Sequence, residues 1–245
     1  MDHGLSIVIA NVRGLNGHAR RTSVRLMVDI VNASIACLQE TNMNLICSST
    51  VLETLGSEYD DYVYLPVIGT RDDILLAWKS RAVTITDPLF STNTITVKVS
   101  TIAGTPWWMI VVCGPQTDAD KIMFLQELRD VRADCRGPWM LCGDFNLMYR
   151  NEDRNNGNLN MRMMGRFRRL LSDLALKEVY IVGGRYTWSN QQSPPILVRL
   201  DRILCTADWE DAHVDCNPLP VAHSRFHFEE FWLRMDGFLV LVTAA

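Results

Sequence analysis

The sequence predicts one mixed α/β domain. Three observations lead to this prediction: a chain of 245 residues without repeats or a linker, a strand–helix–strand pattern near the N-terminus, and a later run of strands followed by amphipathic helices. Hydrophobic residues make up 48% of the chain and charged residues 21%, which is ordinary for a soluble globular protein. A chain of this length can bury a substantial core.

The N-terminal segments predict a crossover unit. Residues 6–11 are apolar and β-branched, which is typical of a buried strand, and residues 34–38 have the same character. Between them, residues 19–31 carry apolar side chains at helical spacing. A strand, a helix and a second strand in this order indicate two parallel strands in a layered α/β fold. A short helix is expected over 48–55.

The rest of the chain alternates between strand and helix patterns. Four strands in a row, separated by turns, favour antiparallel pairing; they are expected over 62–68, 74–78, 94–102 and 107–112. Two longer helices are expected over 118–132 and 161–176, with a polar loop over 150–160 between them. The remaining strands are expected over 139–142, 178–182, 185–189 and 198–204.

Several of these apolar strands end in a carboxylate or an amide. These polar groups are Asn11, Glu40, the pair Asp144 and Asn146, and Asp201. Ligand sites of layered α/β folds lie at such strand ends, and carboxylates beside amides suit Mg²⁺ with a phosphate oxygen as a further ligand. Each residue alone is more often a turn-former or a cap, so the site requires that they converge.

The net charge, the cysteines and the apolar stretches of the chain disfavour several classes of function. A net charge of -4 disfavours tight binding of DNA through charge alone, although it is compatible with an acidic metal site. The seven cysteines form no CxxC pair, which favours buried, reduced thiols over a disulfide framework or a zinc site. No stretch approaches the roughly 20 apolar residues of a membrane helix, and no signal peptide is visible. We expect an intracellular protein, in the nucleus or cytoplasm and not secreted, without a membrane partner.

Five motifs occur in an order that resembles the endonuclease/exonuclease/phosphatase superfamily: Asn11–Leu15, Cys37–Thr41, Cys142–Asn146, Tyr186–Asn190 and Arg199–Arg202. Three further segments resemble the endonuclease domains of plant LINE-type non-LTR retrotransposons: Ile74–Trp78, Gly114–Gln116 and Asn156–Asn160. The resemblance covers roughly residues 5–210. It implies a DNase I-like α/β fold, in which two sheets and flanking helices form a four-layer sandwich.

The resemblance also implies a Mg²⁺-dependent site, with Mn²⁺ as the alternative, that cleaves phosphodiester bonds in DNA. Glu40 matches the main metal ligand and Asn11 its support. Asp144 matches the group that orients or deprotonates the attacking water, and Asn146 matches the amide that hydrogen-bonds the scissile phosphate. Asp201 matches the carboxylate that orients the catalytic histidine.

Three further residues are assigned to the substrate. Thr187 matches a hydroxyl that contacts the phosphate backbone, and Asn190 belongs to the same motif. Arg166 lies in a basic cluster of the helix expected over 161–176, where it contacts phosphate or belongs to a solvated helix face.

The family pattern breaks near the C-terminus. The family ends with Ser-Asp-His and an apolar strand, but the chain contains no Ser-Asp-His, and neither His223 nor His227 follows an aspartate. We therefore expect the last strand to be lost or replaced, with residues 1–216 as the domain and 217–245 as an atypical C-terminal segment. A second departure is Arg71–Asp73, where relatives usually carry glycines, which indicates an altered turn or simple drift.

Three functions remain open. The first is a DNA-nicking endonuclease by ancestry, impaired or inactive without the Asp–His pair. The second is a catalytically dead retrotransposon remnant that at most binds nucleic acid. A weaker third is a phosphatase for small phosphoesters or phosphoinositides. In each case we expect a monomer without an obligate protein partner.

Overall fold

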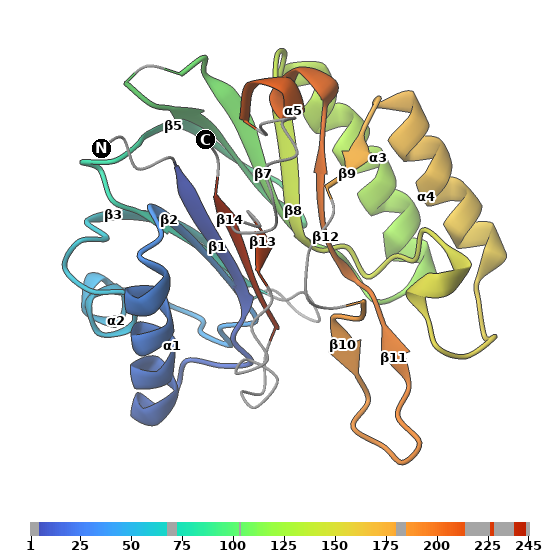
Figure 1. Ribbon diagram of the computed structural model, residues 1–245, viewed down its shortest axis with the longest axis horizontal. Helices are drawn as coiled ribbons and strands as arrows, with labels where there is room; N and C mark the ends of the chain where they lie inside the picture. Colours follow the sequence, from blue (N-terminus) through green and yellow to red (C-terminus); the bar gives the residue numbers. More distant parts are fainter. Residues whose placement is uncertain are drawn as a thin grey trace, which may run out of the picture.

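Two six-stranded sheets pack face to face, and helices cover their outer faces (Figure 1). This arrangement confirms the predicted two-sheet α/β sandwich. The computed structural model describes residues 5–67, 73–102, 104–179, 185–213, 226–227 and 238–243.

The first sheet contains the predicted crossover unit. Strands β1 and β2 run parallel and are joined by helix α1 (His18–Val31). Helices α1 and α2 (Ser48–Thr54) cover the outer face of the sheet. The strand order is β13 (Phe226–His227), β14 (Phe238–Thr243), β1 (Ser6–Asn11), β2 (Ile35–Gln39), β4 (Ile74–Trp78) and β3 (Asp61–Leu65).

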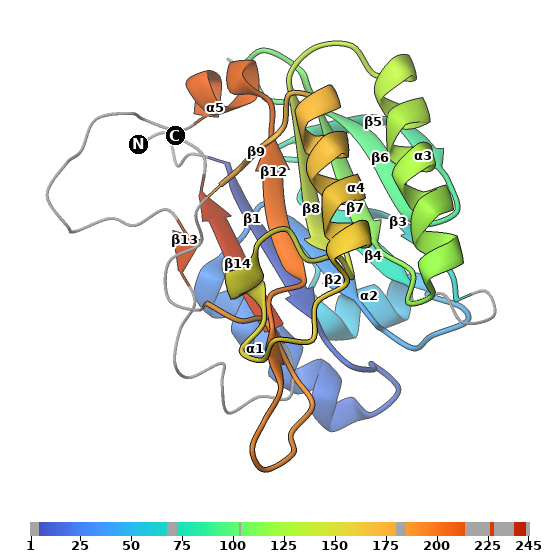
Figure 2. The same cartoon turned by 90° about the vertical axis from the view of Figure 1, so that its right-hand side faces the viewer.

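Helices α3 (Asp118–Asp134) and α4 (Met161–Asp173) lie side by side on the outer face of the second sheet (Figure 2). Its strand order is β5 (Thr84–Phe90), β6 (Thr94–Ser100), β7 (Trp107–Cys113), β8 (Trp139–Asp144), β12 (Asp201–Cys205) and β9 (Lys177–Glu178). The short elements η1 (Asn151–Asp153) and α5 (Ala207–His213) complete this half.

The predicted antiparallel run of four strands is divided between the sheets. Strands β3 and β4 pair in the first sheet, whereas β6 and β7 pair in the second. Strand β5, which the sequence did not predict, lies between these pairs along the chain. Asp87 and Pro88 interrupt its pattern, and the pairing register with β6 shifts between Thr86 and Leu89, as a β-bulge does.

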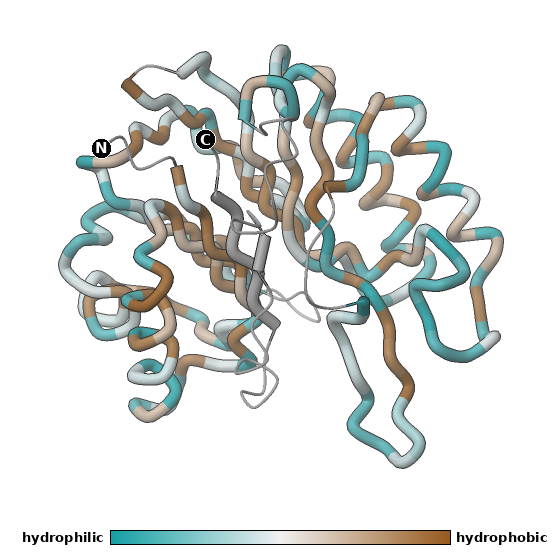
Figure 3. The backbone as a smooth tube through the Cα atoms, viewed as in Figure 1, coloured by the Kyte–Doolittle hydropathy of each residue, from teal (hydrophilic) through white to brown (hydrophobic). Residues whose placement is uncertain are grey.

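Side chains alternate between the inner and outer face of each sheet. Ile7 and Ile9 belong to the core between the sheets, whereas Val8 and Ala10 pack beneath α1 and α2. The apolar stretches gather in the strands and the polar ones on the helices and loops (Figure 3). Because the strand period is two residues, this alternation also decides which way the polar side chains at the strand ends point.

A small two-stranded hairpin projects beyond the end of the second sheet (Figure 1). Its strands are β10 (Trp188–Ser189) and β11 (Leu197–Val198). The strand expected over 198–204 is therefore divided between β11 and β12. The loop before α4 lies against this hairpin, since Arg154 forms an isolated bridge with Val198.

The free edge of β1 is covered by the C-terminal segment. Strand β14 pairs with β1 in antiparallel register, from Ser6 opposite Thr243 to Asn11 opposite Phe238. An unpaired edge strand would expose a row of backbone donors and acceptors, and β14 satisfies them. The division of the chain at residue 216 stays a prediction.

The described cysteines behave as reduced thiols. None of them forms a disulfide, and five are buried: Cys37, Cys113, Cys135, Cys142 and Cys205. Cys47 is exposed, and Cys216 lies outside the described residues. Among the described helices, none has the length and apolar character needed to cross a membrane.

Gly143 lies where the two sheets approach each other closely. It has a φ of +122°, and an added Cβ would lie 2.3 Å from the Val112 carbonyl oxygen and 2.7 Å from Gln39 Nε2. We expect Gly143→Ala to lower the free energy of unfolding by about 3 kcal/mol, because both the clash and the φ are unfavourable. Urea denaturation would measure it. Gly157→Ala, with nothing within 4 Å of its Cβ, is the control; equal losses in both variants would contradict the explanation.

Candidate active site

The predicted polar residues converge at one end of the two sheets. Strands β1 and β2 run parallel, so Asn11 and Glu40 lie at the same edge of the first sheet. In the second sheet, Asp144 and Asp201 stand directly opposite each other in the antiparallel pair of β8 and β12. Their neighbours Cys142 and Ile203 belong to the core between the sheets, so by strand alternation both carboxylates point inward.

Gln39 joins the two sheets at this end. Its side chain is 1% exposed. Its Nε2 donates to the Val112 carbonyl oxygen, and its Oε1 accepts the backbone N–H of Asp144 at 3.2 Å. One buried amide therefore holds the strand that precedes Glu40 against the strand that carries Asp144. No role was predicted for Gln39, although a polar residue at an inward position of an apolar strand could have indicated a buried hydrogen-bonding group.

Glu40 follows the last residue of β2. Its φ of +54° turns the backbone away from the extended path of that strand. The Asn11 amide donates to the Glu40 carboxylate, and Asn11 Oδ1 accepts the Arg13 N–H at 3.3 Å. The Glu40 carbonyl oxygen accepts the Gly14 N–H at 2.6 Å. Asn11 is therefore placed to orient Glu40 directly, and its support of a metal ligand stays a prediction.

Asp73 holds the loop that presents Glu40. It is buried, its carbonyl oxygen accepts the Glu40 N–H at 3.2 Å, and its carboxylate accepts the hydroxyl of Thr41. The same carboxylate accepts the backbone N–H groups of Asn42 at 3.2 Å and Met43 at 3.5 Å. Asp73 is thus a structural part of the loop beside the site, and the two residues before it lie outside the described residues.

Asp144 and Asn146 form a second rigid turn. Asp144 Oδ1 accepts the Asn146 N–H at 2.7 Å, and Asn146 Nδ2 donates to the Gly114 carbonyl oxygen at 2.7 Å. An amide group has two N–H donors, so the second N–H of Asn146 can reach a ligand. Burial lowers the pKa of Lys121 on α3, whereas the negative charges of Asp118 and Asp144 raise it. Lys121 therefore lies close enough to interact electrostatically with Asp144. It was not predicted from the sequence to belong to the site.

Asp201 is buried with an unsatisfied oxygen. Its Oδ1 has no hydrogen-bond partner among the described residues. The pKa of Asp201 is raised to about 7, mainly by burial and in addition by the negative charge of Glu40, against a hydrogen bond from Thr187 and the positive charge of Arg202. Glu40 and Asp201 are therefore close enough to repel each other although they belong to different sheets.

The substrate residues divide into two groups. Thr187 joins the site, since its hydroxyl oxygen accepts the N–H groups of Leu200 at 2.9 Å and Asp201 at 3.1 Å. Asn190 lies in the turn of the projecting hairpin, where its Oδ1 accepts the Ile196 N–H at 2.8 Å. Arg166 lies on the exposed face of α4, on the side of the second sheet away from the carboxylates.

The donor set suits a hard cation held by few protein ligands. Among the described residues, no group of three or more His, Cys, Asp or Glu side chains is placed to bind a metal. Mg²⁺ is usually bound through one or two carboxylates while it retains several waters, and Glu40 with the nearby Asp201 matches that requirement.

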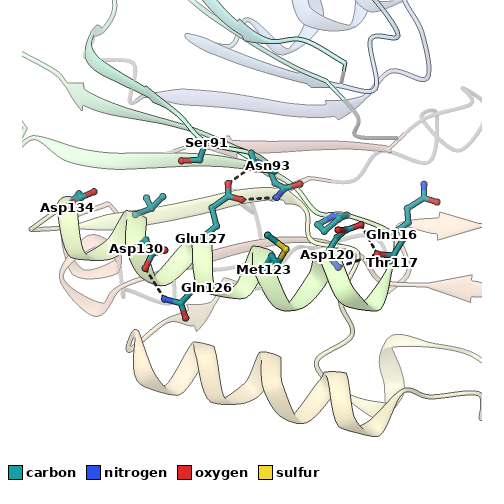
Figure 4. Close-up of a pocket in the computed structure, with 13 residues that line it drawn as sticks. Ser91, Asn93, Gln116, Thr117, Asp120, Met123, Gln126, Glu127, Asp130 and Asp134 are labelled. Atoms are coloured by element: carbon teal, nitrogen blue, oxygen red, sulfur yellow. Dashed lines mark hydrogen bonds between the residues drawn. The ribbon is translucent and has the colours of Figure 1, made fainter. Parts of the chain in front are cut away.

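A separate groove of about 960 Å³ runs along α3 (Figure 4). It is lined by the turn at 91–93, by residues 115–117 and by acidic side chains of α3, namely Asp120, Glu127, Asp130 and Asp134. No lysine or arginine is among the residues that line it. The groove contains none of the predicted site residues, and its charge disfavours a polyanion.

Residues 8–232 match the endonuclease/exonuclease/phosphatase family. The chain belongs to this family. No curated protein sequence matches it significantly. Its fold is similar to a 3'-5' exonuclease from Neisseria meningitidis, with 16% identity, a TM-score of 0.71 and coverage of 98% of this chain and 99% of that one.

Two further solved structures share this fold. The AP endonuclease LMAP from Leishmania major has 15% identity and a TM-score of 0.68, with coverage of 98% of this chain and 88% of that one. The endonuclease domain of TRAS1, a telomere-specific non-LTR retrotransposon, has 13% identity and a TM-score of 0.67, with coverage of 98% of both chains. At these identities the likeness establishes the fold alone.

The raised pKa of Asp201 predicts a pH-dependent stability. The folded-state value of about 7 lies above the usual 3.8, so between these values the folded chain holds a proton that the unfolded chain has released. Stability from this group is therefore fully present below pH 3.8 and is lost as pH rises through 7. We expect Asp201→Asn to flatten this slope and to be more stable than the natural protein at pH 8. Urea denaturation with EDTA from pH 5 to 8 would measure it, with Asp130→Asn as control; parallel slopes for all three proteins would exclude Asp201 as the cause.

Proposed function

We propose that the protein is a Mg²⁺-dependent phosphodiester hydrolase that nicks DNA slowly. The observation that carries the proposal is the convergence of Asn11, Glu40, Asp144 and Asp201 at one end of the sandwich, with the two sheets joined there by Gln39. This arrangement combines carboxylates for a cation with amide donors for a phosphate oxygen. Membership of the family supports phosphoester chemistry at that place.

Each side chain has a distinct task in this proposal. Glu40, oriented by Asn11, holds the cation, which when bound supplies positive charge to a phosphate oxygen. Asp144 orients the attacking water and accepts its proton, and the second N–H of Asn146 donates to a non-bridging phosphate oxygen. Thr187 brings the root of the hairpin to the phosphate backbone, because it is hydrogen-bonded to the backbone beside Asp201.

DNA is the proposed substrate for two reasons: the distribution of charge on the protein surface, and the substrates of solved proteins with a similar fold. Those proteins include AP endonucleases and a Neisseria 3' phosphatase bound to a product DNA hairpin. Exposed arginines lie on α4, on the loop before it and just before the projecting hairpin: Arg150, Arg162, Arg166, Arg169 and Arg185. The groove on α3 is acidic. A duplex would therefore lie over the α4 flank and away from the groove.

The activity is proposed to be slow because the sequence lacks the motif that would supply a histidine to Asp201. In the family pattern this carboxylate orients a histidine within Ser-Asp-His, a motif that the sequence lacks. Asp201 Oδ1 has no partner among the described residues. Loss of a general acid or base costs roughly 10²- to 10⁴-fold in rate. The same observation favours a second candidate, a remnant that binds DNA without cutting it.

Nicking of supercoiled plasmid separates these candidates. With Mg²⁺ we expect conversion to open circles at a rate roughly 10²- to 10⁴-fold below a relative with an intact Ser-Asp-His. Asp144→Ala should abolish it, and Asp130→Ala, in the groove on α3, should not. A rate within about tenfold of the intact relative would refute slow catalysis. DNA binding without nicking in any variant would identify the remnant.

Binding of the cation can be tested without activity. Mg²⁺ that binds only the folded chain should raise its stability, by about 2.7 kcal/mol at a concentration of 100 times Kd. Thermal melts with and without Mg²⁺ would measure this change. We expect Glu40→Gln to lose the response, while Glu152→Gln, an exposed control, retains it. An unchanged response in Glu40→Gln would place the cation elsewhere.

A further inference from the structure

A buried charge network lies directly behind Asp201. The next residue along β12, Arg202, points to the opposite face of the sheet, and its side chain has 0% exposure. Its Nη2 pairs with the carboxylate of Asp153, and its Nη1 pairs with Glu178 Oε1 at 2.6 Å. Arg199 Nη2 reaches the same Glu178 oxygen at 3.2 Å. Two arginines and two carboxylates are thus enclosed on the outer face of the second sheet.

The network connects three segments that are distant in the sequence. Asp153 belongs to η1 in the loop before α4, Glu178 belongs to β9, and Arg199 lies at the root of the projecting hairpin. The Asp153 carboxylate also accepts the N–H groups of Tyr149 at 2.6 Å and Arg150 at 2.7 Å. Its carbonyl oxygen accepts the Arg199 N–H at 2.7 Å.

The loop and the hairpin remain joined beyond the network. Asn155 N–H donates to the Leu197 carbonyl oxygen at 3.1 Å, and Asn155 Oδ1 accepts the Leu197 N–H at 3.0 Å. At the start of β12, the Thr187 hydroxyl oxygen accepts the N–H of Asp201 at 3.1 Å. The root of the hairpin is therefore tied to β12 by Thr187 as well as by the network. In two views at right angles the hairpin extends well past the sheet end (Figures 1 and 2).

Stability alone does not account for these charges. Desolvation of buried ions costs about as much as their attraction returns, and apolar side chains of similar size often replace such networks without loss of stability. An arginine fork, by contrast, fixes the direction of two partners at once, because its donors lie in one plane. Arg202 uses both of its terminal nitrogens in this way, one for each carboxylate.

We propose that the network of Arg202, Asp153, Glu178 and Arg199 positions the β10–β11 hairpin relative to Asp201, and thereby sets how tightly the site holds duplex DNA. The inference rests on the proposed function for its substrate. Arg202 is enclosed by the protein, so it does not touch DNA and acts as a positioning residue. Its effect reaches the substrate only through the hairpin and the loop before α4.

Two variants separate positioning from stability. Arg202→Lys keeps the charge, but a single ammonium lacks the planar fork that engages two carboxylates in fixed directions. Arg202→Met/Asp153→Asn/Glu178→Gln removes the charge of Arg202 together with those of both carboxylates that it engages, so neither carboxylate is left buried without its cation. Asp173→Asn, which breaks the exposed pair of Arg129 and Asp173 between α3 and α4, is the matched control.

Two measurements form the test. Hydrogen exchange is measured without DNA, and the Kd for a short duplex is measured by fluorescence anisotropy. In both Arg202 variants we expect amides of 185–199 to exchange about tenfold faster while those of β8 keep their protection. We expect the Kd to rise about tenfold, and the control to match the natural protein.

Three outcomes would overturn the proposal: unchanged exchange in the hairpin, equally faster exchange in β8, or a loosened hairpin with unchanged Kd. Failure of the natural protein to bind the duplex would refute the proposed function. The exchange data would still decide whether the network positions the hairpin.

Discussion

The site depends on one buried amide, that of Gln39. Its two hydrogen bonds reach the carbonyl oxygen of Val112 and the backbone N–H of Asp144, which belong to neighbouring strands of the opposite sheet. Packing of apolar faces is not directional, whereas this bridge fixes the strand before Glu40 against the strand that carries Asp144. The bridge requires a neighbour without a Cβ, and Gly143 provides it. Hydrogen bonds enclosed in a low dielectric are strong and directional, so the distance between the two halves of the site is set there.

Strand β12 serves two purposes because its side chains alternate. Asp201 faces the interior between the sheets, and Arg202 faces the layer beneath α4. The carboxylate of the site and the arginine that supports the hairpin are therefore adjacent residues on opposite faces of β12. Any movement of β12 along its axis would displace both at once. Charge is distributed unevenly around this end as well, with arginines on the α4 flank and carboxylates in the groove on α3.

Much of the fold could be predicted from local patterns. The bounds of β1 and β4 coincide with those expected, because each is an uninterrupted apolar run. Strand β5 could not be recognised, since Asp87 and Pro88 break its pattern. The site residues were identified through their strand ends and motifs, but their convergence depends on register between strands distant in the sequence. The structural role of Asp73 was not predicted for the same reason: its partners are backbone groups of a loop some 30 residues away.

The closure of the first sheet by β14 and the completion of the site make different demands on the sequence. Backbone pairing along β1 is indifferent to side-chain identity, so any extended segment in a suitable register can cover this edge. A side chain that acts beside Asp201 must instead be of one kind at one position. The paired edge also leaves no row of free backbone groups on β1 for a strand of another molecule, so β14 protects the chain against edge-to-edge aggregation.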